Sequence, residues 1–195
     1  LQNIDPLLSE KALKSAHQFG LYVFKRINQL ADPTQMLKIE YGGMNDALYE
    51  LFDLTDDKRM LTAATYFDET TVFKQLAKGD DVLAGKHANT TIPKLIGALH
   101  RYESLHDVKR ADQYLSPEEK GSLNMYLKAA VNFWQIVIDD HTYVTGGNSQ
   151  SEHFHEPGQV FHDAVLEDGA TTCQTCNTYN LLKFILLLFR VTVVK

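Results

Sequence analysis

The densest group of side chains able to do chemistry lies between residues 141 and 154. This stretch contains His141, Tyr143, the Gly146-Gly147-Asn148 turn and Glu152. Planar polar groups beside aromatic rings suit a polyhydroxylated ligand, and hydrolysis of a glycosidic bond needs a carboxylic acid near the leaving oxygen. The stretch therefore predicts a sugar site. The alternative interpretation is a solvated loop with one acidic residue.

A second candidate pair is His87 and Asn89, which stand two apart in an extended stretch before Pro93. Both side chains hydrogen-bond hydroxyl groups well, and this spacing can direct them to the same side. We therefore expect them to contact a ligand. Alternatively, Asn89 caps a helix and His87 is a surface residue.

A third candidate is the turn of Gly42 and Gly43 before a predicted helix. Glycines at this position leave the first N–H groups of the helix open to a polar ligand. Gly43, Met44 and Asn45 are therefore candidate ligand contacts. The alternative is an ordinary junction between a loop and a helix.

The two cysteines, Cys173 and Cys176, are too few for a disulfide framework. Together with His153, His155 and His162 they could form a zinc site with two Cys and two His ligands. These histidines lack the helical spacing of a zinc finger, however. Two thiols without a metal remain the alternative.

Apolar residues recur at intervals of three or four, which predicts helices along most of the chain. Asp56 is a plausible N-cap for one of them, Pro93 suits the first turn of another, and residues 68–89 read as loop. The predicted helices run from Leu7 to Leu30, Met44 through Phe52, Lys58 to Phe67, Pro93 through Tyr102, Pro117 to Ile138 and Asn177 to Leu188.

No segment alternates between apolar and polar residues as a strand does, so the predicted class is all-α. The spacing of the helical hairpins is typical of a toroid or a solenoid, and we favour part of an (α/α)6 toroid.

Composition excludes several kinds of partner. The 195 residues carry a net charge of −6 and no cluster of Lys or Arg, which argues against nucleic acid. The longest apolar run, Phe184 to Phe189, is far too short to cross a membrane, where about 20 residues are needed. The first residues do not resemble a signal peptide, so we expect a cytoplasmic rather than a secreted protein.

Taken together, the candidate segments resemble one family, glycoside hydrolase family 127, the β-L-arabinofuranosidase group. The resemblance covers roughly residues 7–190 and implies an (α/α)6 toroid. It also implies retaining cleavage of a terminal β-L-arabinofuranosyl or similar pentose unit, by a cysteine thiolate held on zinc. The strings that carry it are Tyr41-Gly42-Gly43-Met44-Asn45, Leu83 to Thr90 with Ile92-Pro93-Lys94, Thr145 to Ser149 with Glu152-His153-Phe154, and Cys176 to Lys183.

The resemblance also assigns roles to particular residues. Glu152 matches the general acid/base of the family, Cys176 matches a zinc-binding cysteine, and His87 matches a histidine that contacts the sugar. Other residues are expected to line the same pocket. They are Gly43, Met44, Asn45 and Asn89, together with His141 and Tyr143, which lie near Glu152 in sequence.

The chain departs from the family pattern at the zinc site. The expected zinc-ligand glutamate is Gln174 here, or Thr171 if Cys173 is the matching cysteine, and neither supplies an anionic oxygen. Zinc is the cofactor that the resemblance implies, but this departure disfavours it in this chain. The nucleophilic cysteine of the family belongs to a paired-cysteine motif that does not occur here.

We therefore expect residues 1–195 to form one partial catalytic domain, shortened at its C-terminal end or at both ends. Such a domain would be nearly inactive alone, and the exposed apolar faces of an open ring would favour pairing with a second copy. The alternative is a non-catalytic helical module that binds a glycan or a protein partner.

Overall fold

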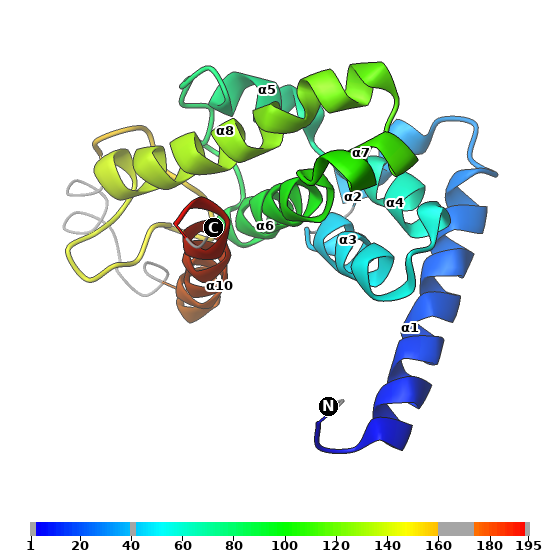
Figure 1. The fold of residues 1–195 in the computed structure, drawn as a ribbon. Coiled ribbons are helices and arrows are strands. Elements are labelled where there is room, and N and C mark those ends of the chain that lie inside the picture. The colour runs from blue at the N-terminus through cyan, green and yellow to red at the C-terminus, as the bar shows by residue number, and fades with distance from the viewer. Residues whose placement is uncertain (1–2, 40–41, 160–173, 194–195) are drawn as a thin grey trace.

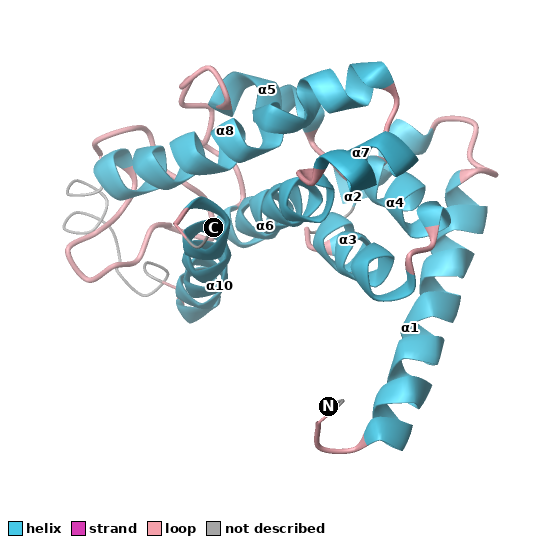
Figure 2. Cartoon of the chain, in the orientation of Figure 1, coloured by secondary structure: helices cyan, strands magenta, loops and turns pink. Residues whose placement is uncertain are grey.

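The computed structural model describes residues 3–39, 42–159 and 174–193, and in these ranges helices alternate with loops (Figure 2). No β-strand occurs in these ranges, which confirms the predicted all-α class. The helices are α1 (Pro6–Ile27), a short 3-10 helix (Pro33–Gln35), α2 (Met36–Ile39), α3 (Met44–Thr55), α4 (Lys58–Thr65), α5 (Thr70–Leu76), α6 (Ala88–Leu105), α7 (Val108–Tyr114), α8 (Pro117–Asp140) and α10 (Thr175–Thr192).

Helices α6 and α10 lie side by side and run in the same direction. Near their first turns, the Asn180 amide donates to Oδ1 of Asn89 at 2.7 Å. Near their last turns, Arg190 donates to Oε2 of Glu103 at 2.6 Å. Because both ends match, the two helices begin at the same end of the molecule.

Helix α3 packs on the other flank of α6 with the same polarity. Close to its start, the Asn45 amide donates to the Lys94 carbonyl at 3.0 Å. Close to its end, the Ser104 hydroxyl of α6 donates to Asp53 at 2.6 Å. Figure 1 shows α3, α6 and α10 as one row, so three helix N-termini meet at one end.

A second layer covers this row. Helix α8 packs against α6 and α5, and α4 packs against α3 and α1. Residues 141–154, the polar stretch singled out from the sequence, follow α8 and contact the starts of α6 and α10. Helices α1 and α10 lie at opposite ends of the array (Figure 1). The closed (α/α)6 ring therefore stays a prediction.

A buried carboxyl group joins the helices of both layers. Asp68 accepts hydrogen bonds from the Tyr49 hydroxyl at 2.5 Å, the Tyr126 hydroxyl at 3.0 Å and the Asn45 amide at 3.0 Å. Burial raises the pKa of Asp68, and the nearby Arg101 guanidinium partly opposes that rise. Hydrogen bonds from α3 and α8 and the charge of Arg101 on α6 thus meet at the Asp68 carboxyl group.

The cap of α4 differs from the prediction. Asp57, not Asp56, is its N-cap, and the Asp57 carboxylate accepts from the Arg59 N–H at 2.9 Å. Asp56 instead ends α3 in the left-handed conformation, with φ of 56°. Because α3 continues to Thr55, only Asp56 and Asp57 separate the two helices.

Two further differences lie around α6. The helix begins at Ala88, well before Pro93, because the N–H of Ala88 bonds the Glu152 carbonyl at 2.8 Å and so holds the first turn. Residues 68–89, predicted as loop, contain α5. Its buried face has only three side chains, which is too short a period to recognise; they are Val72, Phe73 and Leu76.

The outer face of α10 carries a row of exposed apolar side chains at alternating spacings of three and four residues. Each of these side chains is between 54% and 71% exposed: Tyr179, Leu182, Leu186, Phe189 and Val193. Phe184 and Leu188 on the opposite face are buried in the core. None of the described helices is both long and apolar enough to pass through a membrane.

Candidate active site

Glu152 stands at the tip of a tight hairpin. Gln150 and His153 exchange both backbone hydrogen bonds, at 3.0 and 2.9 Å, and the two residues between them, Ser151 and Glu152, have φ of 44° and 69°. Positive φ at both central positions defines a type I′ turn, which favours Asn and Gly. Neither residue is of that kind, so the hairpin holds Glu152 in a costly conformation.

The hairpin is clamped to the segment before α6. The Phe154 N–H bonds the Lys86 carbonyl at 2.9 Å, and the Gly85 N–H bonds the Phe154 carbonyl at 2.8 Å. The Phe154 ring is 2% exposed and contacts the rings of Phe133 and His141 edge-on. Burial of this ring anchors the turn that carries Glu152.

The clamp brings His87 and Glu152 together across 65 residues of sequence. Nε2 of His87 lies 3.1 Å from Oε2 of Glu152, and the two side chains are 27% and 54% exposed. The other ring nitrogen, Nδ1, lies 3.1 Å from the Thr90 hydroxyl. The ring of His153 stands edge-on at 5.2 Å. A carboxyl group beside an imidazole is thus accessible from solvent.

The start of α10 is docked to the same end by two amide contacts. Asn177 donates to the Ser149 hydroxyl at 2.6 Å, and Asn180 donates to Asn89, as described above. Cys176, directly before Asn177, is half-buried on the first turn of α10. His87 and Asn89, which were expected to contact a ligand together, therefore have different partners. His87 lies against Glu152, and Asn89 accepts a hydrogen bond from α10.

Gly42 and Gly43 bring the start of α3 against the start of α6. A Cβ on Gly42 would lie 2.3 Å from the Thr90 carbonyl oxygen, and its φ is +88°, so only glycine fits there. Gly43 is the N-cap of α3, and Met44, which follows it, is half-buried. All three helix starts therefore meet around the first turn of α6.

Three predicted ligand contacts lie deeper than this end. Asn45 and His141 have no exposed surface, and Tyr143 is 8% exposed. Nε2 of His141 lies 2.8 Å from the Asp81 carboxylate, and the Tyr143 hydroxyl lies 2.6 Å from Nε2 of His155. These buried side chains therefore lie in the interior, beneath the loop and the helix starts.

The comparison with family models then identifies the chain. Residues 8–193 match the model described as "Beta-L-arabinofuranosidase, GH127 catalytic domain". The chain belongs to glycoside hydrolase family 127. A comparison with individually curated proteins found no match. The family makes this chain a glycoside hydrolase domain of the arabinofuranosidase type, with a carbohydrate as the corresponding substrate class.

In this family 127 domain, the described residues do not form a zinc site. Sγ of Cys176 lies 3.5 Å from the amide oxygen of Gln174 and 3.8 Å from that of Asn177, and both oxygens are neutral. Zinc in proteins prefers thiolate, imidazole and carboxylate ligands. Residues 3–39, 42–159 and 174–193 bring no three His, Cys, Asp or Glu side chains together as metal ligands would be. The other candidates, Cys173, Thr171 and His162, lie outside the described residues.

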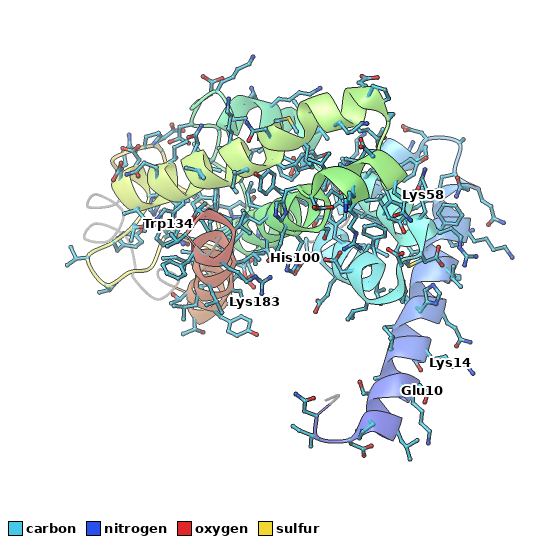
Figure 3. The ribbon with its side chains drawn as sticks, viewed as in Figure 1. Glu10, Lys14, Lys58, His100, Trp134 and Lys183 are labelled. Atoms are coloured by element: carbon cyan, nitrogen blue, oxygen red, sulfur yellow. The ribbon has the colours of Figure 1, made fainter. Side chains whose placement is uncertain are left out.

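A charged seam runs beneath the site of the family 127 domain. His100 of α6 contacts the Asp46 carboxylate of α3, and Lys183 of α10 lies 3.7 Å from the same carboxylate (Figure 3). Burial opposes protonation of His100, but the hydrogen bond and charge of Asp46, with Glu50 and Glu103, raise its pKa overall. The seam ties all three helices of the row together.

Several residues of the site carry no signal that sequence reasoning recognised. Thr90, Asn177 and Asn180 lie inside the family strings, but their roles depend on contacts with distant segments. Asn148 belongs to the turn singled out from the sequence, but the state of its side chain was not predicted. Its side chain is fully buried, and neither amide atom has a hydrogen-bond partner among the described residues. The spacing of Asn177 and Asn180, three residues apart on a helix, is the signal that could have placed both amides on one face.

Proposed function

We propose that this domain binds a terminal β-L-arabinofuranosyl or similar pentose unit and that Glu152 is the general acid/base of a retaining hydrolysis. The observation that supports this most directly is the contact between Nε2 of His87 and Oε2 of Glu152 at 3.1 Å. This contact stands where the starts of α3, α6 and α10 meet.

The chemistry follows from the two side chains. A protonated Glu152 gives its proton to the glycosidic oxygen as the bond to the anomeric carbon breaks. The carboxylate that remains then takes a proton from the water that releases the sugar. His87 can hydrogen-bond a sugar hydroxyl or the carboxylate, because its side chain is partly exposed and its Nε2 atom lies beside Glu152.

The nucleophile is a separate requirement. The chain has two cysteines, at 173 and 176, and they are not adjacent as in the paired-cysteine motif that the resemblance implies. We propose that these residues supply the sugar contacts and the acid/base, and that turnover needs a thiolate from outside this chain. No step of the chemistry above depends on zinc.

Calorimetric titration with methyl β-L-arabinofuranoside tests the proposal. We expect binding by the 195-residue chain and a loss of affinity of about tenfold or more in His87→Ala and in Glu152→Ala, because each variant removes a polar contact. His106→Ala, at the far end of α6, and Glu118→Ala, on α8, are matched controls at exposed positions and should bind as the original chain does. Unchanged binding in both site variants would overturn the proposal.

A non-catalytic glycan-binding module is the second candidate, and Gln174 is the observation that favours it. An amide in place of a carboxylate next to Cys176 weakens a zinc site without removing the sugar contacts. We expect zinc analysis of the purified chain to find well under one ion per chain, with more retained by Gln174→Glu. A full equivalent of zinc in the original chain would argue against this candidate.

A further inference from the structure

The first turn of α6 holds a contact that the site described so far does not use. His87 is the N-cap of this helix, but its side chain does not cap a backbone N–H. Its Nδ1 atom instead lies 3.1 Å from the hydroxyl of Thr90. Histidine has two distinct ring nitrogens, and the partner of one decides which of them carries the proton.

We propose that Thr90 is a positioning residue, whose hydroxyl donates to Nδ1 of His87 and so keeps the imidazole proton on Nε2, facing Glu152. An ionised carboxylate only accepts hydrogen bonds, so Glu152 needs a hydrogen on the ring nitrogen beside it. With Nδ1 occupied as an acceptor, the neutral ring provides that hydrogen at Nε2. Thr90 then donates a hydrogen bond to His87, and His87 donates one to Glu152.

The backbone around Thr90 is arranged to hold it in place. Its N–H bonds the His87 carbonyl at 3.2 Å, so the side chain and the main chain both face His87. On its other side the Thr90 carbonyl lies against Gly42, where no Cβ fits. The backbone of Thr90 is therefore held in place, and its branched side chain has only two common χ1 rotamers in a helix.

The orientation has a consequence for the acid/base, and this part rests on the proposed function. When Glu152 gives its proton to the leaving oxygen, a carboxylate is left behind. A hydrogen on Nε2 of His87 stabilises that carboxylate, whereas a bare Nε2 lone pair would repel it. Thr90 thus acts on Glu152 through His87, without touching the substrate itself.

Two-bond ¹H–¹⁵N spectra of the imidazole ring test the tautomer directly. In the original chain near neutral pH we expect His87 Nδ1 to resonate as an unprotonated acceptor and Nε2 as an N–H nitrogen. Thr90→Val removes the donor at nearly constant shape, and we expect the two nitrogen shifts to move toward each other. Thr90→Ser retains the donor and should restore the original pattern.

Thr91→Val is the matched control. The Thr91 hydroxyl bonds the backbone carbonyl of His87 at 3.0 Å and does not contact the ring, so its removal should leave both nitrogen shifts unchanged. A proton on Nδ1 in the original chain would overturn the proposal, and so would unchanged shifts in a folded Thr90→Val. If that variant does not fold, the spectrum of the original chain and of Thr90→Ser still decides.

Sugar titration separates this inference from the proposed function. We expect Thr90→Val to lower affinity about three- to tenfold, with Thr90→Ser near the original value. If Thr90→Val changes the tautomer while Glu152→Ala leaves binding intact, the proposed function fails and the positioning role of Thr90 toward His87 stands. If Glu152→Ala abolishes binding but the nitrogen shifts of His87 are unchanged in Thr90→Val, the inference about Thr90 fails and the proposed function stands.

Discussion

The two sides of the candidate site are built differently. Glu152 stands on a strained hairpin that is clamped by backbone pairing and anchored by the buried ring of Phe154. Cys176 stands on the first turn of a helix that polar side chains dock to the rest, through Asn177 and Asn180. Apolar burial anchors the first side directly. At the first turns of α10 the contacts are single hydrogen bonds, and the buried apolar residues of that helix, such as Phe184 and Leu188, lie further along it.

The difference teaches which side resists change. A buried aromatic ring contributes several times the free energy of one hydrogen bond, because most of a hydrogen bond's strength is cancelled by the water bonds it replaces. The geometry of Glu152 and His87 should therefore persist when the position of α10 is disturbed. The environment of Cys176 should be the first to alter.

Phe154→Ala should produce the largest effect and break the stronger side. Removing the buried ring leaves a cavity against Phe133 and His141, and we expect a loss of about 3–5 kcal/mol in the free energy of unfolding. Denaturant unfolding measures it. Val144→Ala, at a fully exposed position of the same loop, should stay within about 0.5 kcal/mol. Equal losses in the two variants would contradict the anchoring role.

Asn177→Ala should weaken the second side by a smaller amount. It leaves the Ser149 hydroxyl without its partner, and we expect a loss of about 1–3 kcal/mol. Thr178→Ala, exposed on the next position of α10, is the control. If hydrogen exchange near the start of α10 were no faster in Asn177→Ala than in the control, the docking contact would have no energetic role.

Two replacements of Glu152 separate the conformational cost of its backbone from the role of its side chain. Its φ of 69° suits glycine better than any residue with a Cβ, so Glu152→Gly should be more stable than Glu152→Ala by about 1 kcal/mol. Thermal unfolding of both variants, at equal pH, gives the comparison. A less stable glycine variant would show that the hairpin holds no such strain.

The charged seam of His100, Asp46 and Lys183 should give the smallest effect of these predictions, a change in the free energy of unfolding with pH. Because the folded-state pKa of His100 is raised above its ordinary 6.5, its contribution to stability is complete below that value and declines as pH rises through the folded pKa. Asp46→Asn should flatten this decline, with Glu50, Glu103 and Lys183 as the remaining charges nearby. Unfolding curves from pH 5 to 9 measure it. The same slope in both proteins would exclude His100 as its source.

Local signals predicted most of the fold. Long periodic segments became α1, α3, α8 and α10, and the pattern Ser116-Pro117-Glu118-Glu119 forms a capping box in which Ser116 and Glu119 bond each other's backbone. Short helices and exact starts were missed, because α5 has too few turns and the start of α6 depends on a hydrogen bond to Glu152.

The candidate site was predicted in part. Glu152 and His87 were both singled out from the sequence, and the structure brings them into contact. The role of Thr90 could not be foreseen, since it depends on which ring nitrogen of His87 faces the helix. The bond between Asn177 and Ser149 joins segments whose separation along the chain carries no periodic signal.

The row of apolar side chains along α10, from Tyr179 to Val193, also governs how the chain behaves at high concentration. A net charge of −6 keeps molecules apart at low ionic strength. Added salt shortens the reach of that repulsion to about 10 Å at 0.1 M, while the attraction between apolar surfaces persists. Self-association should therefore increase with salt, the reverse of what ion pairing between copies would give.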